Sequence, residues 1–194
     1  MIQSIRALIA RLSNRSSGQT VDSVVPAADA STEVTPLRLI SAAIRADDRG
    51  AVERLFQAHP ELVDYHSLTT PSWLCTAAAN GSSEVARWLL AQGMDVNIMD
   101  VKGHSCALGF AISNDDLEMV RLLGRHGADP NLGRLMFRAI RRKDAQLGLE
   151  MVNALIEMGI DLDRRYAMPG GEHVSAIEFA LLHDKPLIVD LLRA

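Results

Sequence analysis

Several kinds of residue are scarce in this 194-residue chain, and each shortage narrows what the protein can be. Aromatic residues make up 4% of the chain, so few side chains are available to stack nucleic-acid bases. The two cysteines, Cys75 and Cys106, lack the spacing of a secreted disulfide scaffold, which predicts two buried thiols. No apolar run approaches the roughly 18 residues that a membrane-spanning helix needs. The net charge of −4 opposes a general phosphate-binding surface, so nucleic acid is not the expected partner.

Motifs for catalysis and cofactor binding are also missing. The chain has no glycine-rich phosphate loop, no nucleophile elbow and no HExxH pair. His104 and Cys106 form half of a metal-binding pattern, but no second pair follows at ligand spacing. Adjacent acids occur at Asp47-Asp48 and Asp115-Asp116, each just before a helical pattern, and helix capping explains them better than an acid–base pair. We therefore expect no catalytic residue, no cofactor, no metal and no enzymatic activity.

What the chain does contain is a repeated phrase, in which a leucine, three residues and a glycine precede an acidic turn. It occurs at Leu89–Asn97, Leu123–Asn131 and Leu155–Asp163, with glycine-to-glycine steps of 127−93 = 34 and 159−127 = 32 residues. Glycine ends a helix without a Cβ penalty, and the Asp and Asn that follow favour a turn. The phrase predicts the end of a repeated structural unit.

Two helical patterns precede each phrase. The longer one has one apolar side, and the shorter one carries small residues such as Ala77-Ala78 and Ala111-Ile112. Degraded copies stand at both ends of this region. At the first, Thr35 is predicted to cap a helix that begins at Pro36, and at the last, Ser175 and Glu178 are predicted to form a capping box. The unit is a short inner helix, a loop, a longer outer helix and a projecting turn, which makes the fold an all-α solenoid.

These residues resemble the ankyrin repeat family over positions 35–194. The family's Gly-Ala-Asp-x-Asn close is present as Gly127–Asn131, and its Thr-Pro-Leu-His opening survives in part as Thr35–Arg38. The resemblance implies an ankyrin-type solenoid of about five helix-turn-helix repeats, with approximate bounds 35–66, 67–99, 100–132, 133–163 and 164–194. An amphipathic N-terminal segment and flexible linker, residues 1–34, precede the array.

The same resemblance implies a protein–protein interaction module that binds a protein partner through its concave face and its fingers, as the projecting turns are called. The partner-binding residues expected there are Asn80, Lys102, His104, Asn114, Arg138, Arg141, Arg142, Arg164, Arg165, Tyr166 and His173. Two irregularities fall within this set. Few residues separate Asn131 from the next inner helix, so that finger is expected to be lost, whereas 164–174 is expected to form an enlarged one.

A run of basic residues marks the fourth repeat. Arg134, Arg138, Arg141, Arg142 and Lys143 occur with no acid among positions 134–143, and most of them fall on one side of a helix. One hypothesis is a positive concave patch that captures an acidic protein surface. The alternative is that these charges are solvated, or pair with acids of adjacent loops such as Asp115, Asp116 and Asp144.

The first 34 residues differ from the rest. Ile2, Ile5, Leu8, Ile9 and Leu12 share one helical face, and a linker rich in Ser, Thr and Ala follows. Met1–Leu12 is interpreted as a helix covering the apolar edge of the first repeat, as a frayed arm, or as a segment that contacts a membrane surface or directs export.

The expected function is therefore occlusion or tethering of a protein partner in the cytoplasm. Two more specific roles stay open: a bacterial immunity or antitoxin-like protein that masks a toxin, or an exported effector that uses its N-terminal segment for targeting. The first should form a tight one-to-one complex without needing residues 1–34. The second should lose secretion, but not binding, when those residues are deleted.

Overall fold

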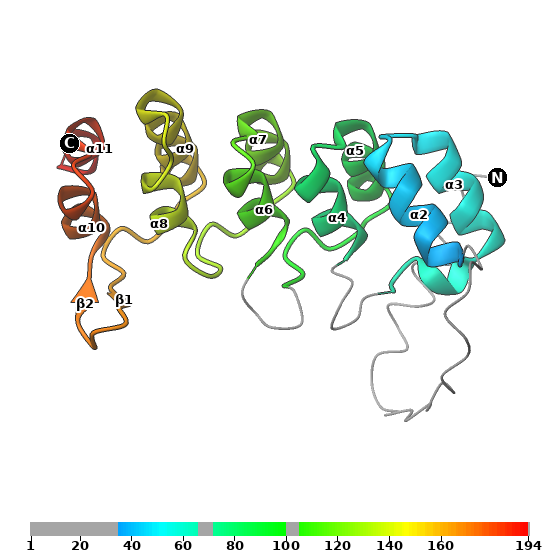
Figure 1. Cartoon of the computed structure of the whole chain (residues 1–194), viewed down its shortest axis with the longest axis horizontal. Helices are drawn as coiled ribbons and strands as arrows, with labels where there is room; N and C mark the ends of the chain where they lie inside the picture. Colours follow the sequence, from blue (N-terminus) through cyan, green and yellow to red (C-terminus); the bar gives the residue numbers. More distant parts are fainter. Residues whose placement is uncertain (1–34, 66–71, 100–104, 194) are drawn as a thin grey trace.

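The computed structural model of the chain describes residues 35–65, 72–99 and 105–193. These residues form an elongated array of five helix pairs (Figure 1). The inner helices are α2 (Pro36–Arg45), α4 (Trp73–Asn80), α6 (Ala107–Ser113), α8 (Leu135–Ile140) and α10 (Ala176–Leu182). The outer helices are α3 (Arg49–Ala58), α5 (Ser83–Ala91), α7 (Leu117–Arg125), α9 (Ala145–Glu157) and α11 (Pro186–Arg193), and a 3₁₀ turn, η1 (Pro60–Leu62), follows α3. The predicted all-α solenoid is confirmed.

No helix within the described ranges has both the length and the apolar character that crossing a bilayer requires.

Glycines end the outer helices as the repeated phrase predicts. Gly93, Gly127 and Gly159 have φ angles of 87°, 82° and 85°, which lie in the left-handed region that glycine enters without strain. The acid two residues further on then fixes the turn, because the Asp129 carboxylate accepts a hydrogen bond from the Asn131 amide at 2.8 Å. Each finger therefore starts from the same backbone geometry.

N-cap side chains start half of the described α-helices. The carboxylates of Asp48, Asp116 and Asp144 each accept the backbone N–H three residues on, at 2.9 Å, so the helix-capping interpretation of the paired acids is confirmed for Asp48 and Asp116. The capping box of Ser175 and Glu178 is present at α10. The prediction for Thr35 is wrong: it precedes Pro36, but its side chain makes no capping hydrogen bond. Thr35 is exposed, so water can satisfy the first amides of α2 instead.

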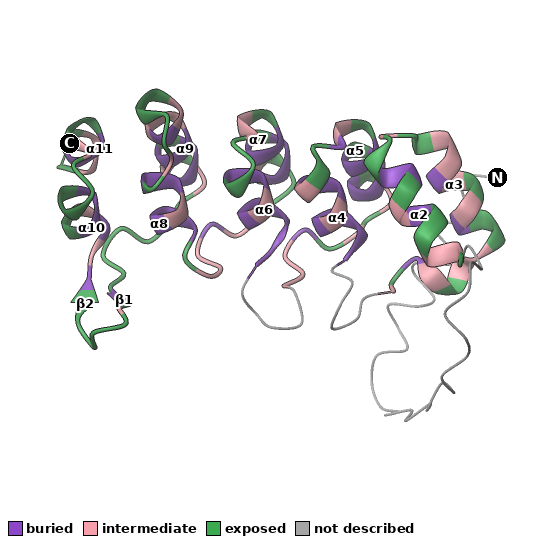
Figure 2. Cartoon of the chain, viewed as in Figure 1, coloured by how far each residue is buried: buried purple, intermediate pink, exposed green. Residues whose placement is uncertain are grey.

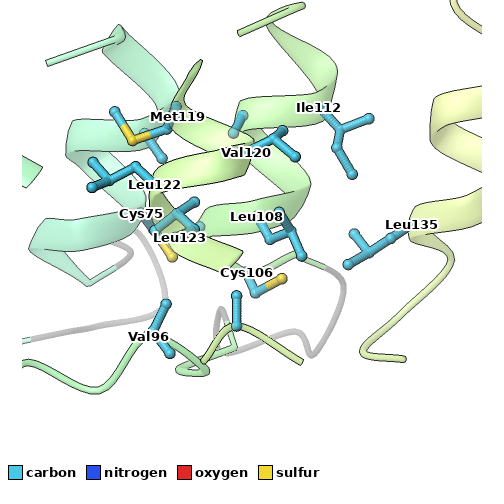
Figure 3. Close-up of a cluster of buried hydrophobic side chains, with 14 of the residues drawn as sticks. Cys75, Val96, Cys106, Leu108, Ile112, Met119, Val120, Leu122, Leu123 and Leu135 are labelled. Carbon is cyan, nitrogen blue, oxygen red and sulfur yellow. The ribbon is translucent and has the colours of Figure 1, made fainter. Parts of the chain in front are cut away.

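The core lies between the two rows of helices and runs the length of the array (Figure 2). Alanine recurs at one inner-helix position in every repeat, which lets neighbouring inner helices approach closely; these residues are Ala43, Ala77, Ala111, Ala139 and Ala180. Cys75 and Cys106 belong to the core near Leu108 and Leu123 (Figure 3). The two cysteines are not joined by a disulfide, and burial raises the pKa of the Cys106 thiol. The prediction of buried thiols is confirmed.

Successive repeats are linked by hydrogen bonds from each repeat to the inner-helix end of the repeat before it. The Ser82 hydroxyl donates to the Ile44 carbonyl at 2.6 Å. The Asn114 amide donates to the Ala79 carbonyl at 2.6 Å. Further along, Arg142 donates to the carbonyls that end α6, and the Lys185 ammonium donates to the Arg142 carbonyl at 2.7 Å. The acceptors are carbonyls in the last turn of an inner helix or just after it, where the regular helical hydrogen bonds run out. We call this series the inter-repeat ladder.

The last two repeats are irregular in the places that the sequence indicates. Helix α8 begins only four residues after Asn131, so no finger projects there. Between α9 and α10 the chain forms an antiparallel hairpin of β1 (Tyr166–Ala167) and β2 (His173–Val174), with Tyr166 opposite Val174. The hairpin projects from the inner-helix side of the array (Figure 1). It extends the surface formed by the ends of α8 and α10.

Candidate protein-binding surface

The basic residues of the fourth repeat divide into two groups. Arg138 and Arg142 are partly buried and turn back onto α6, whereas Arg134, Arg141 and Lys143 are exposed. The run of basic residues therefore separates into two groups, one that packs inside the array and one on its surface.

Arg138 lies along α6. One guanidinium nitrogen, Nη1, donates to the Ser113 hydroxyl at 2.9 Å and to the Gly109 carbonyl at 3.1 Å, and lies 3.3 Å from the Ser105 hydroxyl. Gly109 packs closely here, because a Cβ at that position would lie 3.1 Å from Ser105 Oγ and 3.3 Å from a Leu135 methyl carbon. Arg138 thus joins α8 to α6, and its free hydrogen-bonding capacity toward a partner is correspondingly reduced.

Arg142 is a member of the inter-repeat ladder. Its Nη1 donates to the carbonyls of Ile112 and Ser113 at 2.8 and 2.9 Å, and its Nε lies 3.1 Å from a carboxylate oxygen of Asp115. The Arg142 side chain is 20% exposed, against 47% for Asp115. The alternative interpretation, pairing with an acid of an adjacent loop, is thus correct for this residue.

The exposed group consists of Arg134, Arg141 and Lys143, and we call it the repeat-four cation cluster. Among the residues that the structure describes, Arg141 and Lys143 have no hydrogen bond or ion pair from their side chains, and Arg134 contacts only the ring of Phe137, with its Cζ 6.0 Å from the centroid. The nearby Asp144 is engaged in capping α9. Arg134 and Lys143 were not among the expected partner-binding residues, although the acid-free run from 134 to 143 contains both.

The hairpin finger brings together the other predicted residues of this region. Arg164 donates to the Asn131 carbonyl, and its Cζ lies 5.1 Å from the centroid of the Tyr166 ring. Arg165 donates to the His173 carbonyl at 2.6 Å and to Glu178 at 3.0 Å. The Tyr166 ring is 6% exposed and burial raises its pKa, so this residue anchors the finger and offers a partner little surface.

The remaining predicted residues have separate environments. Asn80 is exposed and donates to the Thr76 carbonyl of its own helix at 2.8 Å. Asn114 is occupied by the ladder bonds to the end of α4. Lys102 and His104 lie outside the described residues. Of the predicted set, Arg141, Arg164, Arg165 and His173 are exposed on the last two repeats.

Glu178 couples the finger to α10. Its carboxylate accepts the Ser175 amide at 2.8 Å and faces the Arg165 guanidinium. The hydrogen bonds from Ser175, followed by the positive charge of Arg165, hold the pKa of Glu178 below its ordinary value. The ionised carboxylate therefore stabilises the start of α10.

The stability of the last repeat is expected to fall in acid because of Glu178. A carboxyl with a lowered pKa contributes stability above its unfolded-state pKa of about 4.3, and that contribution is lost as the pH drops through the lower folded-state value. Amide hydrogen exchange at Glu178 and Phe179 should accelerate below about pH 4. Glu178→Gln, which keeps the cap geometry, should make exchange at Phe179 nearly independent of pH in this window once intrinsic rates are corrected. Equal pH dependence in both proteins would contradict the assignment.

Within the described ranges, no group of three or more His, Cys, Asp or Glu side chains is arranged to hold a metal ion.

A stack of short helix pairs with turns projecting to one side defines a helical repeat protein. Comparison with known proteins identifies the repeat family. Residues 39–134 match the family model described as ankyrin repeats, in three copies. The chain is also 31% identical over 102 residues to the B-cell lymphoma 3 protein homolog of Mus musculus, an alignment that covers 52% of this chain and 22% of that protein. The chain thus spans about a fifth of the length of that relative. It belongs to the ankyrin repeat family, whose members are typically non-enzymatic protein–protein interaction modules.

Proposed function

We propose that this protein binds a protein partner of acidic surface through the end of its array, at the repeat-four cation cluster and the adjoining finger. The observation that carries the proposal is the state of Arg141 and Lys143, which are exposed and engage no described acid. Arg138 and Arg142 act differently, because their guanidinium groups are committed to α6. The exposed cations and the finger residues Arg164 and Arg165 lie on consecutive repeats, and an acidic protein surface complements them.

The proposal rests on long-range attraction as well as contact. Charges at the edge of an interface mainly raise the rate of association, and this effect is screened by salt. Binding through the cation cluster should therefore be strong at low ionic strength and weaker at high ionic strength. The partner would be held or masked, in keeping with a module that has no catalytic motif.

The test compares two charge-reversed variants in quantitative partner capture. Arg134→Glu with Arg141→Glu reverses the cluster, whereas Arg121→Glu with Arg125→Glu makes the same change in charge on the outer helix α7. Partners are identified by mass spectrometry with the unaltered protein, and the affinity of each captured protein is then measured at low and high salt. The cluster variant is expected to bind about tenfold more weakly at low salt, with a flatter salt dependence, while the α7 variant binds normally. Equal affinity of the cluster variant and the unaltered protein would refute the proposal.

A further inference from the structure

The last helix pair presents to solvent a face that every earlier repeat buries. Leu181 of α10 stands at the position occupied by Ile44, Ala78, Ile112 and Ile140 in the preceding inner helices. Each of those four residues is 0% exposed because the next repeat covers it, whereas Leu181 is 55% exposed. The stacking surface of the array is thus open at α10 and α11. We call it the terminal face.

Two more exposed leucines lie on the same helix pair, at positions that are exposed in earlier repeats as well. Leu182 of α10, at the position of Arg141, is 70% exposed, and Leu187 of α11, at the position of Glu84 in α5 and Glu118 in α7, is 53% exposed. Terminal repeats of such arrays normally have a polar outer face that keeps them soluble. The fifth repeat of this array has apolar side chains instead, so its surface is suited to binding a further apolar element.

The terminal face also has a hollow beside the finger. A cavity of about 620 Å³ lies between β2 and α10, and its lining residues are Glu172, His173, Val174, Glu178, Leu181 and Leu182. The exposed acids Asp184 and Asp190 lie on the same terminal helix pair. The cavity is therefore lined by Val174, Leu181 and Leu182 together with two acids, of which Glu178 is paired with Arg165. Such a lining suits an apolar segment that carries positive charge.

We propose that the chain's own segment Met1–Leu12 docks as a helix on the terminal face. Its apolar residues Ile2, Ile5, Ile9 and Leu12 have the spacing of a helix that inserts one side into a groove. Arg6 borders that side, Arg11 lies on the polar side, and no acid occurs before Asp22. The segment thus supplies an apolar side for the exposed leucines of the terminal face and positive charge for its acids.

Charge separates this docking site from the other open end of the array. Leu39 of α2 is 43% exposed, so the first repeat also has an uncovered apolar residue. Helix α2 itself carries the exposed cations Arg38 and Arg45 and no acid, and these cations repel Arg6 and Arg11. On the last helix pair the exposed acids Asp184 and Asp190 outnumber the exposed cation Arg193, so the charge there attracts Arg6 and Arg11.

Size separates the segment from a second copy of the chain. Three half-exposed leucines provide apolar area on the order of a few hundred Å², which is the extent of one short helix. A stable dimer interface buries about 800 Å² on each partner. The terminal face is therefore too small for a second copy of the chain but large enough for one short helix.

The linker is long enough for docking within one molecule. Residues 13–34 reach at most about 75 Å when extended, at 3.3–3.6 Å per residue. Five inner helices packed about 10 Å apart give an array of about 40 Å. Docking between two molecules would use the same contacts. The signal loss should persist on dilution if the segment docks within one molecule, and should fade if it docks between two.

The test places a spin label on the segment of the full-length chain. Gln3→Cys puts a single reactive thiol on its polar side, because Cys75 and Cys106 are 1% and 2% exposed. The nitroxide is expected to remove most of the NMR intensity of the Leu181, Leu182 and Leu187 methyl groups. Leu181→Glu with Leu182→Glu should restore the intensity of the Leu187 methyls, and so should Arg6→Glu with Arg11→Glu. Leu39→Glu, the matched change at the other end, should leave the loss in place.

Three results would overturn the proposal. One is signal loss centred on Leu39, which would place the segment on the first repeat. Another is the absence of signal loss anywhere in the array. The third is self-association that Leu181→Glu abolishes while the label has no effect, which would make a second copy the occupant. Fluorescence of Trp73 and Trp88 verifies that each variant is folded.

Discussion

Replacing Phe137 by alanine is expected to lower the free energy of unfolding by about 3–5 kcal/mol, the cost of removing a large buried ring. The Phe137 ring is 5% exposed and stacks on the Phe179 ring, with centroids 3.8 Å apart and an interplanar angle of 6°. It also contacts the Tyr166 ring at a centroid distance of 4.6 Å. One side chain thus holds α8, α10 and the finger together, and its loss should loosen the entire last repeat.

Two spectroscopic signals can show which repeat Phe137→Ala destabilises. Trp73 and Trp88 report on the second repeat, whereas far-ultraviolet circular dichroism reports on all helices. In urea, the two transitions should separate in Phe137→Ala, with dichroism changing first, because the last repeat unfolds before the rest. Phe110→Ala, which truncates a partly buried ring in the third repeat, is the matched control and should cost less. Coincident transitions and a loss below about 1 kcal/mol would contradict the role given to Phe137.

Replacing Arg142 by alanine is expected to cost about 2–3 kcal/mol. The change removes charge-assisted hydrogen bonds to the carbonyls of Ile112 and Ser113 and leaves these helix-end groups without their donor. It also leaves Asp115 without its cation, although that carboxylate is half exposed and contributes less. The weakened contact lies between the third and fourth repeats, within the array.

Arg141→Ala is the control for this prediction. Arg141 is adjacent in sequence and carries the same charge, but it is exposed, so its removal should change stability by less than about 0.5 kcal/mol. Urea titration of both variants, followed by circular dichroism, measures the difference. Equal stability of the two variants would show that the bonds from Arg142 are not important for folding.

The repeat pattern allowed most of the scaffold to be predicted from the sequence. Helix ends at Gly93, Gly127 and Gly159 follow from local backbone chemistry, and so do the caps at Asp48, Asp116 and Ser175. Such features depend on a few neighbouring residues. Thr35 is the exception, since its position at an exposed edge allows water to replace the cap.

The surface was harder to predict, because it depends on contacts between repeats. Helical spacing placed Arg138, Arg141 and Arg142 close together, but it could not tell which of them turn inward. That choice depends on the acceptors that α6 offers, the Gly109 carbonyl and Ser113 hydroxyl for Arg138 and the carbonyls that end α6 for Arg142. The burial of Tyr166 likewise depends on Phe137, which lies 29 residues earlier in the chain.

The hydrogen bonds of the inter-repeat ladder all run from a later repeat to the one before it. Ser82, Asn114, Arg142 and Lys185 each complete the end of an inner helix that the ribosome has already synthesised. During translation, the end of an inner helix therefore lacks these hydrogen bonds until the following repeat emerges and supplies its donor. The newest repeat is always the least complete one. Folding on the ribosome should accordingly lag behind synthesis by one repeat.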